Sequence, residues 1–408
     1  MDYKTVIVHD TNWNRIAYID TYTSLIWTRK FSDCGDFELY LPFKKRYMEF
    51  LKVKNYITLE DDPFDAVLDA DGTIPKNCVY AMIIEHVEIG QDESGSIMMT
   101  VTGRSLASIL YRRVLYHDVI MGTGGEATPT KGEFVKRLID LCFGVGEFSE
   151  DNFPARQWKK GNGSIPYYTV IDLTTDKKRE IHTAMNSENL GDVLREFCVN
   201  NSLGIDIQYC ATDTQGGEVD RYYIIISQGT DRSGSVFFRR DLDNLSNAQY
   251  VEDISNYANG ARVTFANTET HQVYTTSGIF DLHSGTTSRS IPSDVRVIEG
   301  ESGLDRYEVF LTTSVSSDAS NYDERMKKDI LRQLSAMGKN TEVSAEIIDG
   351  GTYKMGRDYS LGDTVTISTD FGVTVTARIA EIAECWDTSG HSIVPTFERY
   401  SFAKEEES

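Results

Sequence analysis

The stretch at residues 122–132, GTGGEATPTKG, carries the residue types of a phosphate-binding loop. Such a loop needs a Gly directly before its Lys, and a Ser or Thr after it to hold magnesium. Here Thr130 precedes Lys131 and Gly132 follows it. The spacing therefore excludes a phosphate loop and predicts a surface loop. The Gly-Val-Gly run at 144–146 follows a predicted helix rather than a strand, so it is not a dinucleotide-binding fingerprint.

An acidic loop at residues 61–76 is the candidate metal site of the sequence. Asp69 and Asp71, followed by a Gly, imitate part of a calcium-binding loop. Such a loop also needs ligands at its first and twelfth positions, which here are Val67 and Cys78. The ligand set is incomplete, and we expect a solvated loop without a metal ion.

Residues for covalent or acid–base catalysis do not gather in any known pattern. The seven histidines are isolated, and neither an H-E-x-x-H nor a G-x-S-x-G motif occurs. Acidic pairs are frequent, but a chain with a net charge of −22 must contain them. The cysteines are too far apart for a zinc site or a disulfide framework, which favours a reducing cytoplasm as the place of synthesis. They are Cys34, Cys78, Cys142, Cys198, Cys210 and Cys385. We therefore assign no catalytic residue, cofactor or metal ligand.

Length and charge bound the function further. A chain of 408 residues, 40% of them hydrophobic, is long enough for two or more domains with their own cores. No apolar run approaches the roughly 18 residues of a membrane span, and no secretory signal is visible. The acidic residues are spread along the chain and disfavour a surface that grips phosphates. The charge serves either solubility alone or a surface that nucleic acid must pass without binding.

The elements of the chain are organised around residues 24–42. Two runs alternate strictly between apolar and polar positions, which predicts a half-buried hairpin. Leu25, Trp27 and Arg29 share one face of the first strand, and Phe37, Leu39 and Leu41 share one face of the second. Turn residues around Gly35 connect the strands, and Pro42 ends the second one.

The remaining pattern is rich in strands. About seven strands are predicted in the first 103 residues, joined by short connections, which suggests an antiparallel barrel or sandwich. Helical spacing predicts helices at 131–143, at 187–203 with Ser187 as N-cap and Gly204 beyond its end, and at 322–337. Further strands are expected at 205–209, 222–227, 262–266, 272–277, 342–348, 363–368 and 373–382.

One pattern occurs twice. Residues 56–59 and 365–368 are both strands with Thr among β-branched residues. Each is followed, after a loop, by A-x-I-x-E-x-V or A-x-I-x-E-x-A, at residues 81–87 and 377–383. This similarity favours a duplicated barrel, although alternating strands can resemble one another by chance.

Three segments together resemble a known family. They are WTRKFSDCGDFELYLP at 27–42, GRSLASILYRRV at 103–114, and YSLGDTVTI at 359–367 with the following ARIAEI. They are similar to the siphovirus-type proteins that form the hub at the distal end of a phage tail, the N-terminal part of tail-associated proteins. The resemblance covers most of the chain.

The resemblance implies a fold and an assembly. Three chains would close the tail tube, each giving two tube-like antiparallel β-barrels separated by a discontinuous α+β portion, a β-rich α+β fold. We expect the first barrel at residues 1–115 and the α+β domain at 116–204 with about 278–338. The second barrel would comprise 205–277 and 339–408.

The resemblance supplies no catalytic residue, and its motif residues are expected to be structural: Trp27, Arg29, Gly35, Phe37, Gly103, Arg104, Gly362 and Asp363. Acidic residues in predicted strands are candidates for the lining of a DNA conduit: Glu38, Glu85, Glu88 and Glu381. The implied location is the distal tail of the virion. The implied partners are two further copies, a distal tail protein or tube ring, a tape-measure protein and a receptor-binding or tip protein. Double-stranded DNA would pass without specific binding.

Two other functions fit parts of the sequence. A hub of a headless or contractile tail-like particle would share the fold without conducting DNA. A β-rich protein that binds or cleaves glycans is suggested by 22 tyrosines and abundant acid. Related tail proteins continue into a lytic domain, and we expect none here because the last strand is predicted at about 397–402.

Overall fold

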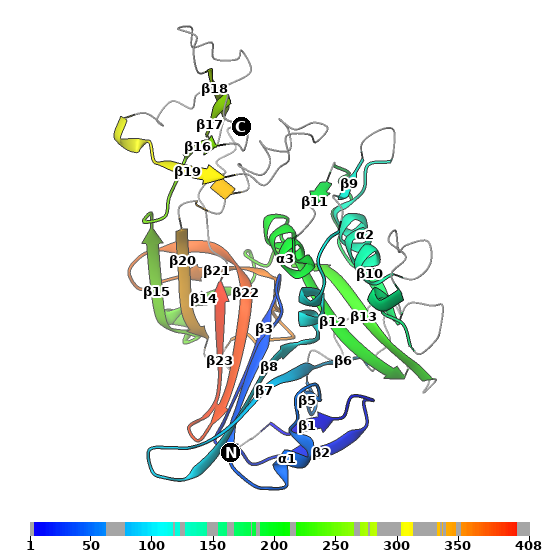
Figure 1. The fold of residues 1–408 in the computed structure, drawn as a ribbon. Helices are drawn as coiled ribbons and strands as arrows, with labels where there is room; N and C mark the ends of the chain where they lie inside the picture. Colours follow the sequence, from blue (N-terminus) through cyan, green and yellow to red (C-terminus); the bar gives the residue numbers. More distant parts are fainter. Residues whose placement is uncertain are drawn as a thin grey trace. The chain divides into compact units, whose positions relative to one another are not determined.

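The computed structural model describes most of the chain and is drawn in Figure 1. The described residues are 4–62, 78–116, 119–122, 127–144, 154–160, 167–180, 182–184, 188–212, 218–264, 270–275, 278–283, 303–312, 333–334, 337, 340–347 and 352–397. The chain divides into two compact units, Met1–Ala248 with Ser344–Glu398, and Gln249–Val343 with Arg399–Ser408. The fold is β-rich with few helices, which confirms the expected β-rich α+β class.

A 13-stranded sheet is the largest sheet of the structure; most of its strands belong to the first unit, and β15 and β20 are shared with the second. Its path runs β15-β20-β23-β22-β3-β4-β8-β7-β5-β1-β2, and β21 and β14 branch from β22. The early strands are β1 (Val6–His9), β2 (Arg15–Ile19), β3 (Ser24–Lys30), β4 (Asp36–Pro42), β5 (Tyr56–Leu59), β7 (Met82–Gln91) and β8 (Ile97–Ser105). The later ones are β14 (Phe237–Arg239), β15 (Leu245–Asp253), β20 (Asn340–Ile347), β21 (Thr364–Ser368), β22 (Thr374–Asp387) and β23 (Gly390–Phe397). Among the described residues the two ends of this path, β15 and β2, do not pair with each other.

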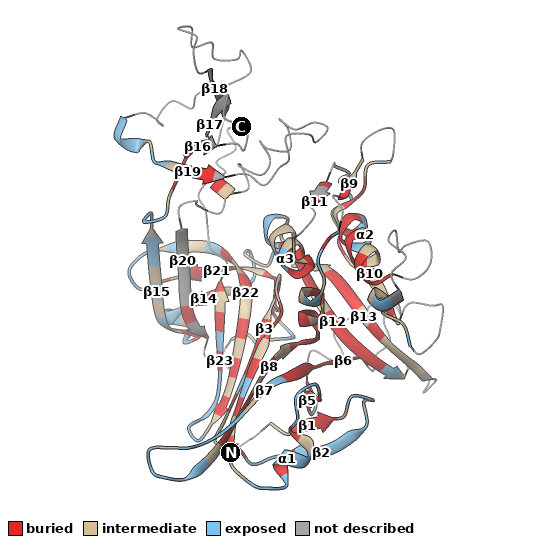
Figure 2. Cartoon of the chain, viewed as in Figure 1, coloured by how far each residue is buried: buried red, intermediate tan, exposed pale blue. Residues whose placement is uncertain are grey.

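The hairpin at residues 24–42 lies in the middle of this sheet, as its alternation predicts. β3 and β4 pair with Trp27 opposite Phe37. The side chains of Leu25, Trp27, Phe37 and the two leucines of β4 are buried, because the apolar face packs on the core. Figure 2 draws much of β3 as buried. β3 also pairs with β22, so the hairpin links an early part of the sequence to a late one.

The repeated sequence pattern corresponds to a repeated arrangement. β5 pairs antiparallel with β7, and β21 pairs antiparallel with β22. In each case the second strand forms an antiparallel pair with the next one, β7 with β8 and β22 with β23. Two similar strand groups are therefore present in one continuous sheet.

A second sheet packs against the longer helices of the first unit. It has the order β10-β13-β12-β6, from β10 (Tyr168–Asp172), β13 (Glu218–Gln228), β12 (Leu203–Thr212) and β6 (Cys78–Tyr80). α2 (Lys131–Phe143), α3 (Leu190–Asn200) and the 3₁₀ helix η1 (Leu106–Arg112) share a core with it. Smaller elements are α1 (Tyr47–Phe50), η3 (Pro154–Arg156), η4 (Arg240–Leu242) and the pair β9 (Val119–Met121) with β11 (His182–Ala184).

Three expectations differ from the structure of this second sheet and its helix α3. Residues 205–212 and 218–228, expected in the second barrel, lie instead in β12 and β13 beside β10, because their apolar side chains pack with α2 and α3. The N-cap of α3 is Asn189, whose side chain accepts a hydrogen bond from Gly191 N–H, and Ser187 lies outside the described residues. Gly204 is a residue of β12 rather than the residue that ends α3.

The second unit has its own four-stranded sheet, in the order β18-β17-β16-β19. Its strands are β16 (Gly260–Thr264), β17 (Thr270–Thr275), β18 (Gly278–His283) and β19 (Glu308–Thr312), and η5 spans Gly303–Asp305. The helix expected at 322–337 lies almost entirely outside the described residues, as do most of the acidic loop at 61–76 and the end of the chain after Phe397.

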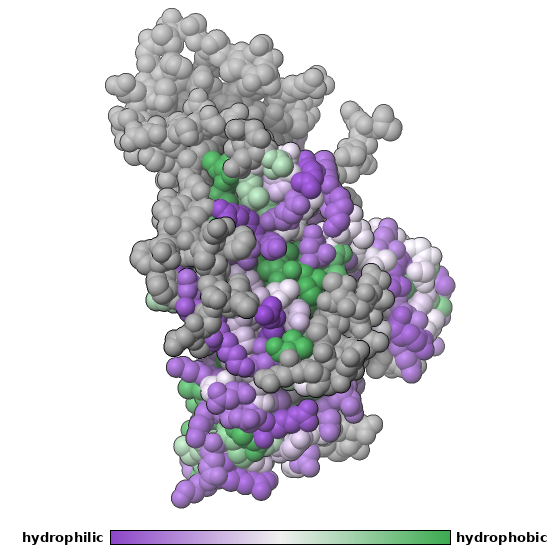
Figure 3. All heavy atoms as spheres, turned by 90° about the vertical axis from the view of Figure 1, so that its right-hand side faces the viewer, coloured by the Kyte–Doolittle hydropathy of each residue, from purple (hydrophilic) through white to green (hydrophobic). Residues whose placement is uncertain are grey.

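Two further observations concern the described chain as a whole. The six cysteines all lie in described residues and are free thiols. No helix among the described residues is long and apolar enough to span a membrane. In the view of Figure 3 the described surface is mostly hydrophilic, and hydrophobic residues form small separate groups.

Candidate functional site: the acidic face of the central sheet

The five strands β22, β3, β4, β8 and β7 present two different faces. One face packs on the core through a row of buried apolar side chains. The other carries the residues that alternate with them. Across the five strands, one row on this face is Cys385, Ile26, Glu38, Thr102 and His86, and another is Asp387, Ser24, Tyr40, Thr100 and Glu88.

The four glutamates expected to line a conduit all lie on this second face. Glu38 and Glu88 belong to the two rows above. Glu381 pairs in register with Lys30. Glu85 stands at a register shift between β7 and β8, and its carboxylate receives hydrogen bonds from Arg104, at 2.7 Å from Nε and 3.1 Å from Nη2. The structure thus brings the four together on one surface, which we call the acidic face.

The acidic face carries more carboxylates than cations. In the stretches of these five strands that pair with one another, its acids are Asp36, Glu38, Glu85, Glu88, Glu381 and Asp387, and its cations are Lys30 and Arg104. Like charges on a shared surface repel an approaching polyanion over roughly a Debye length, about 8 Å at physiological salt. The face therefore has a net negative charge.

Both cations of the acidic face are engaged by its own carboxylates. Lys30 Nζ lies 2.8 Å from Asp36 Oδ2 and 3.7 Å from Glu381 Oε2. Burial opposes the charge of Lys30, but the hydrogen bond to Asp36 prevails and raises the pKa of the ammonium group. Burial raises the pKa of Glu381, and Lys30 offsets part of that effect. The hydrogen bonds to Glu85 raise the pKa of Arg104. Neither cation is available to bind a phosphate without losing its partner.

A buried charge cluster joins the same strands on the opposite face. Arg29 of β3 donates a hydrogen bond from Nη1 to Glu384 Oε2 of β22 at 2.6 Å, and another from Nη2 to Asp62, just after β5. Burial would lower the pKa of Arg29, but the two carboxylates raise it. Burial would raise the pKa of Glu384, whereas His391 and Arg29 hold it below its usual range. The cluster connects three parts of the chain inside the core.

The two motif glycines, Gly35 and Gly103, are required by close approaches of the backbone. A Cβ at Gly103 would lie 1.8 Å from the Ile83 carbonyl oxygen on β7. A Cβ at Gly35 would lie 2.1 Å from the Thr28 carbonyl oxygen. Any side chain at these positions would force the neighbouring backbone to move.

A family model for siphovirus ReqiPepy6 Gp37-like proteins matches residues 5–397, a range that includes all three sequence motifs. The chain belongs to this family. Among curated protein sequences, none matches this chain. The crystal structure of the 43 kDa tail protein of prophage MuSo2 from Shewanella oneidensis has 13% sequence identity and a TM-score of 0.52, covering 97% of this chain and 98% of that one.

Two further solved structures are similar over their length. They are a tail protein from Neisseria meningitidis MC58, with 11% identity, a TM-score of 0.48 and coverages of 97% and 96%, and prophage tail protein gp18 from Listeria monocytogenes EGD-e, with 9% identity, a TM-score of 0.47 and coverages of 98% and 95%. The Shewanella structure establishes that this chain has the fold of a phage tail protein. Family and fold together support a structural role in a phage tail.

The third motif of this tail protein fixes a turn beside the central hairpin. Gly362 has φ +89°, and a Cβ there would lie 2.2 Å from the Phe31 ring. The Asp363 carboxylate accepts hydrogen bonds from the Ser360 and Thr230 N–H groups and from Arg232 Nε, at 2.8–2.9 Å. The residues Gly362 and Asp363 thus position β21 against the segment that follows β3.

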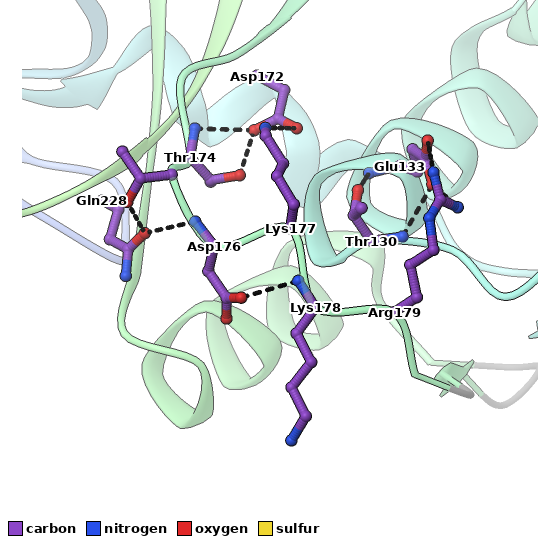
Figure 4. Close-up of polar contacts among 10 residues, drawn as sticks. Thr130, Glu133, Asp172, Thr174, Asp176, Lys177, Lys178, Arg179 and Gln228 are labelled. Carbon is purple, nitrogen blue, oxygen red and sulfur yellow. Dashed lines mark hydrogen bonds and ion pairs between the residues drawn. The ribbon is translucent and has the colours of Figure 1, made fainter.

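Residues of the segment that resembles a phosphate loop cap the start of α2 (Figure 4). Thr130 is the N-cap of α2 and forms a reciprocal capping box with Glu133, whose carboxylate also contacts Arg179. Lys131 Nζ lies 2.9 Å from Asp176 Oδ2. The positive end of the helix and its Lys therefore have partners within the chain. Of the described residues of the segment, 127–130 precede α2 without helical structure, and the helix begins at Lys131, as its spacing predicts.

Sequence reasoning missed an aromatic contact between the two sheets of the first unit. Trp13, in the turn between β1 and β2, stacks on Tyr56 and Tyr209 with ring centroids 4.3 and 3.8 Å apart. Its Nε1 donates a hydrogen bond to the Tyr222 hydroxyl at 3.0 Å. The exposed position of a Trp in a predicted turn is the signal that could have indicated a distant partner.

A pocket of about 460 Å³ lies next to the start of β7. Its lining includes Lys54, Tyr56, Ile83, Glu85 and Arg112. Among the described residues of the chain, no three His, Cys, Asp or Glu side chains gather as a metal site. The acidic loop at 61–76, the candidate calcium site of the sequence, lies outside the described residues after Asp62.

Proposed function

We propose that three copies of this protein form the hub at the distal end of a siphovirus tail tube. The hub would adapt the six-fold tube to a three-fold tip and let DNA pass. Family membership and the tail-protein fold support the tail role. The repeated strand groups within one sheet support the finer assignment, because three chains with two groups each supply six similar units.

The acidic face is the observation that best supports the passage of DNA through the hub. In the assembled hub it would line the lumen, with Glu38, Glu85, Glu88 and Glu381 among its residues. Each phosphate held by a Lys or Arg adds to the affinity for DNA and would slow its passage. A face whose two cations are held by its own carboxylates avoids such contacts.

The domain division follows from the same proposal. Residues 1–115 would give the first tube-like barrel, and residues 339–408 with β14 and β15 most of the second, each completed by neighbouring strands in the assembly. The α+β portion would begin at residue 116. The partners would be a distal tail protein or tube ring, a tape-measure protein and a tip or receptor-binding protein.

We propose a structural function without enzymatic activity. A zymogram against peptidoglycan should stay blank, and soluble sugars should not shift the melting temperature of the protein. A cleared band from the pure chain, or a sugar-dependent shift, would favour the glycan-directed alternative and reject the structural one.

Native mass spectrometry of the purified chain tests the proposed assembly. The expected mass is that of three copies of the 46.0 kDa chain. Measurement over a range of protein concentrations separates a weak trimer from a monomer, since mass action favours the trimer as concentration rises. A chain that stays monomeric at every concentration, or that forms a dimer as its largest species, would reject the trimeric hub.

A further inference from the structure

The central sheet contains the same strand order twice. The order β5-β7-β8-β4-β3 recurs as β21-β22-β23-β20-β15. In both groups a short strand pairs with a long one, which forms a hairpin with the next strand, followed by a strand that lies elsewhere in the sequence. The two groups thus share the order of five neighbouring strands, more than the two strands of a single hairpin.

The register of pairing agrees between the two groups. Gly103 of β8 is opposite Ile84 of β7, directly before a register shift, and Phe397 of β23 is opposite Ile379 of β22, also directly before one. Taking these two pairs as equivalent, the next strand agrees as well. Met99 is opposite Leu41 of β4, and its counterpart Ile393 is opposite Ile347 of β20.

Burial agrees with this correspondence. Met99, Val101 and Gly103 are buried on β8, and so are their counterparts Ile393, Pro395 and Phe397 on β23. Leu39 and Leu41 are buried on β4, and so are Ala345 and Ile347 on β20. The two strand groups therefore agree in both register and burial. A slip by one residue would turn every side chain to the other face, so this agreement makes the groups structurally equivalent.

The two strand groups are joined at one place within the chain, where β22 pairs with β3. The first half of β22 pairs with β21, and its second half, residues 381–387, pairs antiparallel with β3. β7 is the counterpart of β22. Its first residues pair with β5, whereas residues 85–91 pair only with β8 among the described strands. The stretch of β7 equivalent to the joint is thus an open edge.

Figure 2 draws this part of β7 as largely exposed, and its residues include apolar and charged ones. Ile89 is 40% exposed, and Ile97, opposite Gln91 on β8, is 49% exposed. Glu85, His86 and Glu88 are exposed as well. Unpaired edges with backbone donors and acceptors bind other strands, and charges on them restrict which strand can bind.

The counterpart of β3 is β15, which pairs with β20 and ends the path of the sheet. We propose that residues 85–91 of β7 pair antiparallel with β15 of a second copy of this chain. This contact repeats, between chains, the joint that β22 and β3 form within one chain. It deepens the proposed hub and rests on it, because a head-to-tail contact of this kind closes only in a ring.

The charges of the two strands give the contact a distinctive salt dependence. β7 contributes Glu85 and Glu88, and β15 contributes Glu252 and Asp253. Added salt screens repulsion between carboxylates. We expect the association of chains to strengthen, rather than weaken, as salt is raised from low to physiological concentration.

Engineered disulfides test the pairing. In a Cys385→Ser background, which leaves the five buried native cysteines in place, Glu88→Cys on β7 is combined with one Cys at a time at Ala248, Gln249, Tyr250 or Val251 on β15. These four positions cover both faces and neighbouring registers, and a disulfide forms only where Cα atoms come within about 7 Å. Oxidation should shift the band on a non-reducing gel from one chain to covalent dimers and trimers for at least one position, and reductant should reverse the shift.

The matched control replaces Glu88→Cys by Tyr18→Cys on β2, the strand at the opposite end of the sheet, whose side chain is 59% exposed. It should give no covalent ladder with any β15 position. Circular dichroism and melting temperatures verify that each variant is folded.

The outcomes separate this inference from the proposed hub. A trimer by native mass spectrometry without cross-links from Glu88→Cys at any β15 position overturns the strand pairing and leaves the hub. Cross-links from Tyr18→Cys instead would assign the contact to β2 and also overturn the pairing. A chain without trimers and without cross-links rejects both proposals.

Discussion

Arg29 of β3 and Glu384 of β22 stand 355 positions apart in the sequence and form an ion pair with 2.6 Å between Nη1 and Oε2. Both side chains are buried, and Asp62 binds the second terminal nitrogen of Arg29. The pair lies under the joint between the two strand groups of the central sheet. An early strand and a late strand of the chain are therefore held together by this buried pair, and its loss should destabilise the whole first unit.

Arg29→Ala should destabilise the protein strongly. Removing the guanidinium leaves two buried carboxylates without their cation, which typically costs about 3–5 kcal/mol. Chemical denaturation measures the loss. Arg104→Ala is the matched control, since Arg104 pairs with Glu85 on the exposed face of the same sheet, and such pairs contribute about 0.2–1 kcal/mol. Equal losses in the two variants would contradict the proposed role of the buried cluster.

Gly103→Ala should be destabilising because its Cβ would meet the Ile83 carbonyl oxygen on β7. Overpacking of this kind costs about 1–3 kcal/mol, and more where backbone must move. Gly90→Ala, on β7 and with no atom within 4 Å of its Cβ, is the control and should change the free energy of unfolding little. The midpoints of denaturant unfolding decide between the two, and an unchanged midpoint for Gly103→Ala would reject the close approach.

Asp206 makes the stability of the protein depend on pH. Burial raises the pKa of this carboxyl group on β12 to about 6, above the roughly 3.9 of an unfolded Asp. Between these values the folded chain binds more protons than the unfolded one, so this group makes stability fall as pH rises. Asp206→Asn should stabilise the protein at pH 7.5, on the order of 1–2 kcal/mol after allowance for partial exposure.

The comparison of two pH values isolates the Asp206 effect. The gain from Asp206→Asn should be clearly smaller at pH 5, where the wild-type carboxyl is largely protonated. The exposed Asp20→Asn variant should follow the wild type at both pH values. A gain from Asp206→Asn that is the same at pH 5 and pH 7.5 would show that the carboxylate charge is not its cause.

Reversing charges on the acidic face should create an affinity for DNA. In Glu38→Lys/Glu88→Lys two carboxylates become cations that have no carboxylate partner of their own. Duplex binding should appear at low salt and decline steeply as salt rises, because each phosphate contact releases counterions. Asp20→Lys/Glu49→Lys changes the net charge equally outside the acidic face. Electrophoretic mobility shifts compare them, and equal binding by both variants would show that location on this face is unimportant.

Local pattern was sufficient for most elements of the first unit. The alternation of residues 24–42 predicted a hairpin with Trp27 and Phe37 inside, and both are buried on paired strands. The spacing of α2 predicted its bounds, since Thr130 and Glu133 cap it locally. These features depend on neighbours in sequence, which is why sequence alone reveals them.

Contacts between distant segments could not be predicted in the same way. Nothing in the alternation of residues 203–228 distinguishes a barrel strand from a strand beneath α2 and α3, and the two strands proved to be the latter. The pairing of β3 with β22 depends on which edges remain open after the hairpins form. Glu384 did carry a signal, because it alternates in phase with the buried Ile382 and Trp386.

In the proposed hub, three chains surround a lumen lined by the acidic face. Electron cryomicroscopy of the purified assembly, or of tails that contain it, would show this arrangement. We expect a three-fold ring with six similar strand groups around a channel wide enough for duplex DNA, and with Glu38, Glu85, Glu88 and Glu381 on its wall. A ring whose channel is lined by the apolar face or by a net basic surface, or a single chain in the assembled tail, would contradict it.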